Sequence, residues 1–63
     1  MNSFSPHQPT LPWWVEVYIA VSQQMYHLGP FKSRAEAKLS RGAHVNDLLQ
    51  QETRDIVALI KQC

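Results

Sequence analysis

The stretch from Trp13 to Val21 reads WWVEVYIAV, in which every second residue is large and apolar. Strand side chains point alternately to the two faces of a sheet, and aromatic and β-branched residues favour strands. We therefore predict a strand that sends its two adjacent tryptophans to opposite faces. One face would carry Trp13, Val15, Val17, Ile19 and Val21, and the other Trp14, Glu16, Tyr18, Ala20 and Ser22.

A second strand is predicted directly after the first. The polar break Ser22–Gln24 separates the first apolar run from Met25–Leu28. Two strand-like runs joined by so short a break are typical of an antiparallel hairpin. We expect Gly29-Pro30 to end the second strand, because proline cannot donate to a ladder.

The segment SRAE, from Ser33 to Glu36, is a capping box that predicts the start of a helix. We expect this helix to run for about two turns and to stop at Gly42. So short a helix must pack on the hairpin to be stable. The predicted core consists of Val15, Val17, Ile19, Tyr26, Leu28, Ala35 and Leu39.

The last segment, AHVNDLLQQETRDIVALIKQC, allows two interpretations. Residues 46–61 could form one long helix, because Val45, Leu48, Leu49 and Ile56 approximate helical spacing. Alternatively, NDLLQQE is a helical turn and Ile56–Lys61 a third strand. The fold class is therefore α+β, either a ββαβ domain or a ββαα domain with a helical C-terminus.

The length of 63 residues allows one domain, which we place at residues 12–63. Residues 1–11 contain Pro6 and Pro9 among polar residues, and we expect a flexible leader there. The single cysteine, Cys63, argues against a secreted disulfide scaffold. No apolar run approaches the roughly 20 residues of a membrane span, so a cytoplasmic protein without membrane insertion is expected.

The charge balance limits the classes of partner. Six Lys and Arg against five Asp and Glu give a net charge of +1, which provides no basic footprint for nucleic acid. Near-neutrality lowers self-repulsion, which favours contact with proteins and leaves a homo-oligomer open.

The chain offers few groups for catalysis or metal binding. Cys63 stands at the end of the chain and His7 in the leader, so neither is held in a site. Glu16 and His27 are expected to face each other across the hairpin as a polar pair. His44 with Asp47 supplies only two ligands, too few for zinc. We therefore expect a protein that is not an enzyme, with no cofactor and no metal.

A surface remains as the candidate site. One helix can cover only one face of the sheet, which leaves the opposite face with Trp14, Tyr18, Met25 and His27. An aromatic patch among polar groups is typical of protein-binding surfaces. Alternatively, such a face could stack nucleobases or a glycan, but the Lys and Arg residues lie on the predicted helix and tail.

The ordered set PWWVEV, LGPFKSRAEA, NDL and IKQC, within residues 12–63, resembles a small cyanobacterial family described as domain of unknown function 1816. Met25 stands where that family tends to have cysteine, and GAHVNDL replaces its GYIEDL. The resemblance implies a ββαβ fold and favours a third strand over a terminal helix. It implies no activity. From the candidate surface we expect a small non-enzymatic regulatory or assembly factor that docks on a larger protein or complex. The resemblance suggests that its setting is cyanobacterial photosynthesis or associated metabolism.

The chain also resembles SPOR domains, more weakly, because Gly-Pro-Phe followed by Ser-x-x-x-Ala occurs in both. SPOR domains bind peptidoglycan glycan. SPOR domains are longer and are normally exported.

Overall fold

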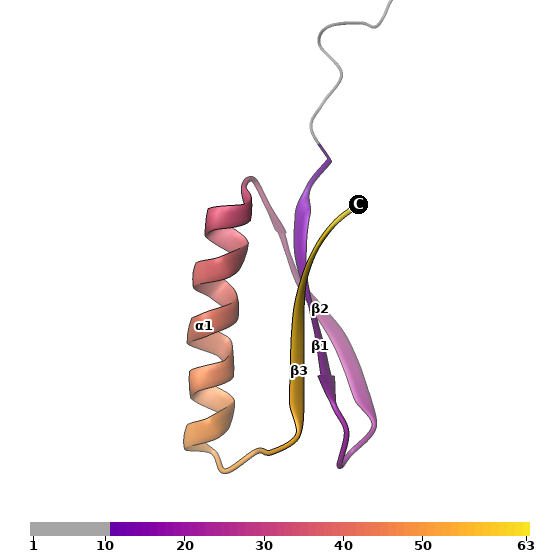
Figure 1. Cartoon of the computed structure of the whole chain (residues 1–63), viewed down its shortest axis with the longest axis vertical. Helices are drawn as coiled ribbons and strands as arrows, with labels where there is room; N and C mark the ends of the chain where they lie inside the picture. Colours follow the sequence, from indigo (N-terminus) through magenta and orange to yellow (C-terminus); the bar gives the residue numbers. More distant parts are fainter. Residues whose placement is uncertain (1–10) are drawn as a thin grey trace, which may run out of the picture.

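The computed structural model describes residues 11–63, which form three strands and one helix in the order ββαβ (Figure 1). Strand β1 spans Trp13–Ile19, β2 spans Gln24–Phe31, α1 spans Arg34–Gln50 and β3 spans Ile56–Gln62. The predicted small α+β domain is therefore confirmed. The predicted leader, apart from its last residue, lies outside the described residues, as does His7.

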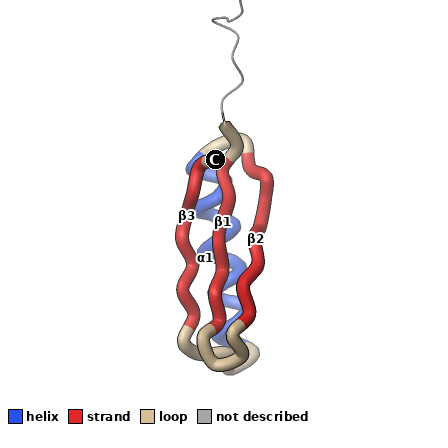
Figure 2. The backbone as a smooth tube through the Cα atoms, turned by 90° about the vertical axis from the view of Figure 1, so that its right-hand side faces the viewer, coloured by secondary structure: helices blue, strands red, loops and turns tan. Residues whose placement is uncertain are grey.

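The three strands form one antiparallel sheet in the order β2-β1-β3. Figure 2 shows β1 in the middle of the sheet, with α1 behind it. The tail thus contains a strand, and the ββαα alternative is wrong. The loop between α1 and β3 holds Glu52 at φ 63° and Asp55 at φ 58°. Positive φ at these two residues breaks helical geometry, and the chain leaves the loop extended.

The hairpin differs from its prediction at both ends. Strand β1 stops at Ile19 rather than Val21, because the chain turns through Ala20–Gln23 and leaves Val21 76% exposed. Strand β2 continues through Gly29-Pro30 to Phe31, so the prediction that these residues end it is wrong. The register shifts there, where one residue of β1 opposes two of β2. A bulge on an edge strand accommodates a residue that lacks an N–H.

Helix α1 begins as the sequence predicts. Ser33 is the N-cap, and its hydroxyl accepts a hydrogen bond from the Glu36 N–H at 3.1 Å. The Glu36 carboxylate accepts from the Lys32 N–H at 3.0 Å, one residue earlier than the capping box predicts. The first bond satisfies a backbone donor that the first helical turn leaves free, and the second satisfies the N–H of the residue before the N-cap.

The predicted stop at Gly42 is wrong, because α1 runs for 17 residues. Glycine in a helix interior costs about 1 kcal/mol relative to alanine. Packing beyond the glycine offsets that cost, since Leu48 lies against the core and His44 contacts Tyr26 of β2. The helix ends at Gln50, and the N–H of its C-cap, Gln51, donates to the carbonyls of Asp47 and Leu48.

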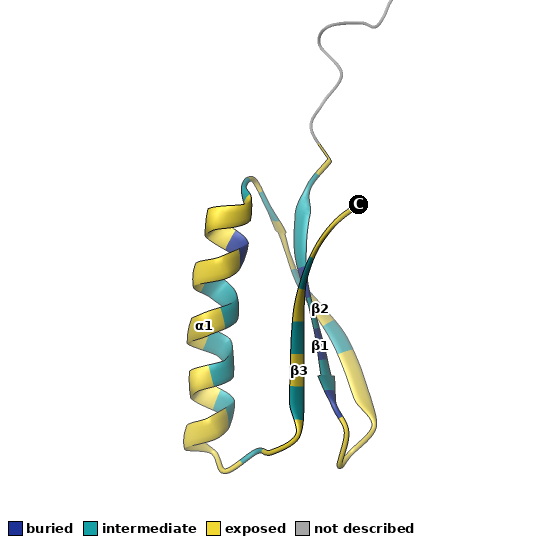
Figure 3. Ribbon diagram, in the orientation of Figure 1, coloured by how far each residue is buried: buried dark blue, intermediate teal, exposed yellow. Residues whose placement is uncertain are grey.

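The core lies between α1 and the central strand, where Figure 3 shows the buried residues. Ala35 and Leu39 are wrong as core residues: both are exposed, Leu39 by 76%. Ala37 is the buried helical residue, and Leu39 points roughly the opposite way, because two residues turn a helix by about 200°. The buried residues are Val15, Val17, Ile19 and Ala37, flanked by Trp13, Tyr26, Leu28, Phe31, Leu48, Ile56, Ala58 and Ile60.

Candidate functional site

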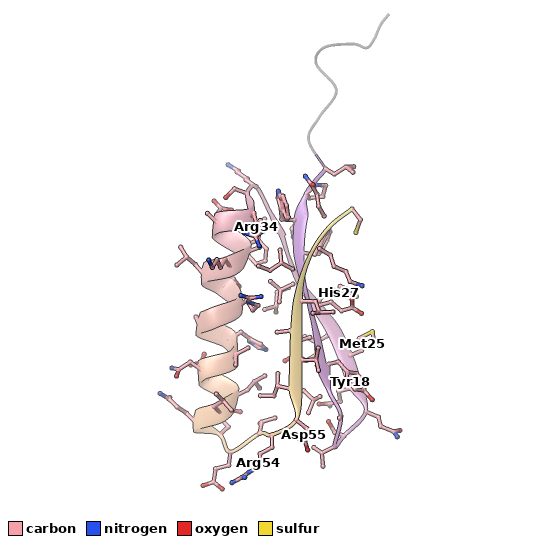
Figure 4. All side chains as sticks on the ribbon, viewed as in Figure 1. Tyr18, Met25, His27, Arg34, Arg54 and Asp55 are labelled. Atoms are coloured by element: carbon pink, nitrogen blue, oxygen red, sulfur yellow. The ribbon has the colours of Figure 1, made fainter. Side chains whose placement is uncertain are left out.

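The sheet has one face covered by α1 and a second face that no described element covers. Figure 4 shows Tyr18, Met25 and His27 on this second face, pointing away from the helix. The strand registers place matching residues of all three strands beside one another. We call this surface the open face. It consists of Trp14, Glu16 and Tyr18 from β1, Met25 and His27 from β2, and Val57, Leu59 and Lys61 from β3.

Trp14 is half-buried because it contacts both neighbouring strands. Its ring lies over Gly29, where an added Cβ would come within 3.0 Å of the indole. It meets the His27 ring edge-on, with centroids 6.5 Å apart and planes at 88°. Its indole N–H donates to the carbonyl of Cys63 at 3.3 Å. Trp14 is therefore held in one orientation, with part of its surface still available to a partner.

The opposite end of the open face is apolar. Tyr18 is half-buried between Met25 on β2 and Val57 on β3. Met25 is 58% exposed, Val57 47% and the neighbouring Leu59 50%. The exposed apolar area is therefore contiguous across three strands rather than scattered, which is the arrangement found at binding surfaces.

An ion pair lies between these two ends. Lys61 Nζ contacts Glu16 Oε1, and the Glu16 side chain is only 15% exposed. The hydrogen bond from Lys61, helped by the positive charges of Lys61 and His27, lowers the pKa of Glu16 below its ordinary value of 4.5, although burial acts in the opposite direction. Glu16 is thus held ionised, and the two charges of the pair cancel.

The structure brings together all four residues that the sequence singled out for this surface. It also places His27 opposite Glu16, as predicted, but the ionic partner of Glu16 is Lys61 of β3. Sequence reasoning missed the contribution of Val57 and Leu59. The alternation within IVALIK carried that signal, because it places these two residues on one face once the segment is a strand.

The other reactive side chains in the described part of the chain do not gather into a site. The His44 ring lies 2.5 Å from the Tyr26 hydroxyl, on the helix-covered face, and makes no pair with Asp47. Cys63 is exposed, and its N–H donates to the Pro12 carbonyl at 3.2 Å. Within residues 11–63, no group of three or more His, Cys, Asp or Glu could hold a metal ion.

A cleft of about 530 Å³ lies where the hairpin turn meets the loop after α1. Its floor includes Ile19, Tyr26 and Leu48, and its rim carries Glu52, Arg54 and Asp55. The rim thus carries both positive and negative side chains.

No helix in the described part of the chain is long and apolar enough to cross a membrane.

Comparison with known proteins identifies the family of this chain. No curated protein and no solved structure is significantly similar to this chain. Residues 7–63 match the family model described as Domain of unknown function (DUF1816), which covers nearly the whole sequence. The chain therefore belongs to the DUF1816 family.

Proposed function

We propose that this protein is a non-enzymatic interaction module whose open face docks on a larger protein or complex. The observation that carries the proposal is that all three strands supply half-buried or exposed large apolar side chains to one face, while the single helix covers the other. Aromatic residues and methionine are enriched at the centres of protein interfaces. Tyr18 and Met25, which lie directly opposite each other, supply that chemistry here.

Charge favours a protein over a nucleic acid as the occupant. Among the described residues of the open face, Lys61 is the one Lys or Arg side chain, and it is already paired with Glu16. Binding of nucleic acid depends on basic groups that neutralise phosphates. A face whose charges already cancel is better matched to a partner's apolar surface.

The setting of this interaction, in cyanobacterial photosynthesis or associated metabolism, rests on the family resemblance. In that setting the protein would act as a cytoplasmic regulatory or assembly factor.

Site-specific photo-crosslinking tests the docking surface directly. A photoreactive phenylalanine analogue replaces Met25 on the open face, and a matched variant carries it at Leu39, which is 76% exposed on the outer side of α1. In lysate of the source organism, we expect the probe at position 25 to give a discrete crosslinked protein band that the probe at position 39 does not give. Equal labelling patterns from the two positions would contradict the proposal.

A second measurement separates docking from folding. Tyr18→Ser should remove the crosslinked band from the probe at position 25, while the circular dichroism spectrum stays that of the wild type. In parallel, labelled single-stranded RNA is titrated at low and high salt. Salt-sensitive RNA binding that Tyr18→Ser abolishes would replace the protein partner with a nucleic acid.

A further inference from the structure

Two hydrogen bonds establish which backbone groups of β3 face β1. The Ala20 N–H donates to the Asp55 carbonyl at 3.1 Å, and the Cys63 N–H donates to the Pro12 carbonyl at 3.2 Å. In an antiparallel ladder alternate residues bond to the neighbouring strand, and the residues between them point their backbone groups to the other side. The N–H and C=O groups that point to the outer edge of the sheet are therefore those of Ile56, Ala58, Ile60 and Gln62.

Apart from Lys61, the described residues give this edge none of the features that usually prevent strands from pairing. The register between β1 and β3 is continuous, without a bulge. The segment from Ile56 to Ile60 is entirely apolar and contains no proline or glycine. Natural edge strands are normally protected by charges, prolines, bulges or a covering element. The other edge, β2, has such protection, because Pro30 and the register shift interrupt its ladder.

We propose that the occupant of this edge is β3 of a second copy, paired antiparallel about a two-fold axis at Leu59. This register overlaps the whole strand, with Ile56 opposite Gln62 and Ala58 opposite Ile60 of the second copy. Every outward N–H and C=O of both strands then finds a partner, which gives about eight hydrogen bonds. The product is a continuous six-stranded sheet with an isologous interface.

Charge and space fit a second copy. In this register Lys61 lies opposite Val57 of the second copy, so like charges do not face each other, and Lys61 is already paired with Glu16. The two-fold axis places both helices on the same face. The two central strands are three strand spacings apart, about 14 Å, which leaves room for two helices about 10 Å across. The chain's own residues 1–10 are a poor substitute, because Pro6 and Pro9 lack an N–H.

Seven paired residues make a small interface, so the association is expected to be weak and to depend on concentration. Sedimentation equilibrium on the full chain, from about 10 µM to about 1 mM, measures it. Amide exchange followed by NMR provides the residue-level signal. The amides of Ala58 and Ile60 have no acceptor within the described chain, so their protection should rise with concentration, whereas protection of the Leu59 amide should stay constant.

Ala58→Pro is the selective variant. It removes one outward N–H and no bond to β1, and it leaves the open face unchanged. We expect at least a tenfold increase in the dimer dissociation constant with a folded circular dichroism spectrum, and with crosslinking from position 25 retained. This retention separates the dimer from the docking proposal, because each can fail while the other holds.

Leu59 tests the register, because each copy places it opposite itself. Leu59→Glu and Leu59→Lys should each be monomeric through like-charge repulsion, and an equimolar mixture should associate again. If Ala58→Pro fails to fold, these two Leu59 variants still test whether the dimer forms. A wild-type chain that stays monomeric at about 1 mM would overturn the proposal. So would a mixture that stays monomeric, or a dimer that Tyr18→Ser abolishes and a folded Ala58→Pro does not weaken.

Discussion

At the scale of single residues, the two glycines of the chain have different structural roles. Gly29 adopts φ 130°, a region that other residues avoid, and an added Cβ would come within 3.0 Å of the Trp13 carbonyl and the Trp14 ring. Gly42 has helical neighbours on both sides and nothing within 4 Å of an added Cβ. One glycine is required by the close approach of Trp14, and the other is a replaceable position on the helix surface.

These positions give a matched pair of substitutions. Gly29→Ala should lower the free energy of unfolding by about 1 to 3 kcal/mol, because it adds both backbone strain and a clash. Gly42→Ala should raise it by about 0.5 to 1 kcal/mol through helix propensity. Urea denaturation followed by circular dichroism measures both. In a Trp13→Phe background, Gly29→Ala should also shift the tryptophan emission, and unchanged emission would show that the indole does not rest on the glycine.

The ion pair of Glu16 predicts how stability depends on pH. Because the pKa of Glu16 is lowered in the folded state, its stabilising contribution is complete above its ordinary value of 4.5 and is lost as pH falls through the folded value. Glu16→Gln should therefore reduce stability at pH 7 and flatten its decline below pH 4.5. Thermal unfolding from pH 2.5 to 7 measures this change. Lys61→Met should flatten the decline of stability below pH 4.5 in the same way. If stability still falls steeply in acid in both variants, the decline comes from other carboxylates.

At the scale of elements, the hairpin and the helix start follow local rules, and the helix end does not. Alternation in β1 and the cap at Ser33 involve neighbouring residues, so the sequence alone predicts them. Gly42 is a helix stop only if nothing beyond it packs, and Leu48 packs on the sheet. The same tertiary contact sets which side of the helix faces inward. The prediction that Ala35 and Leu39 belong to the core is wrong for that reason. The two helical turns predicted from the sequence contain too few large apolar residues to show which side of the helix faces inward.

The orientation of α1 can be tested with adjacent leucines. Leu48 lies against the core, whereas Leu49 is 57% exposed. Leu48→Ala should cost about 2 kcal/mol of unfolding free energy, and Leu49→Ala less than about 0.5 kcal/mol. Urea denaturation of the two variants measures the difference. Equal losses would mean that the helix is rotated from the orientation described.

At the scale of the whole molecule, the open face and the β3 edge both follow from how the described elements are arranged. Within residues 11–63, α1 covers one face of the three-stranded sheet, and β3 lies at an edge of that sheet. The open face was predictable in part, since Trp14, Tyr18, Met25 and His27 follow from alternation within the hairpin. The part of the open face that β3 supplies was not predictable, because it depends on which strand β3 pairs with, and sequence periodicity does not determine pairing. This part consists of Val57, Leu59 and the ion pair of Lys61.

This two-layer arrangement also predicts how the molecule unfolds. The fully buried large side chains are Val15 and Val17 of the central strand, which touches every other element. A domain of this size has only a few kcal/mol of stability, so a loss of about 2 kcal/mol from Val17→Ala removes a large share of it. Val57→Ala, at a half-exposed position on the open face, should change stability by less than about 0.5 kcal/mol.

Thermal unfolding of both variants measures this contrast, with far-ultraviolet circular dichroism and tryptophan emission followed together. Because one core joins all four elements, the two signals should share one midpoint in the wild type and in Val17→Ala. Separate midpoints would show that the sheet and the helix unfold independently. A loss from Val57→Ala as large as that from Val17→Ala would instead mean that the open face is part of the folded core and is covered in the intact protein.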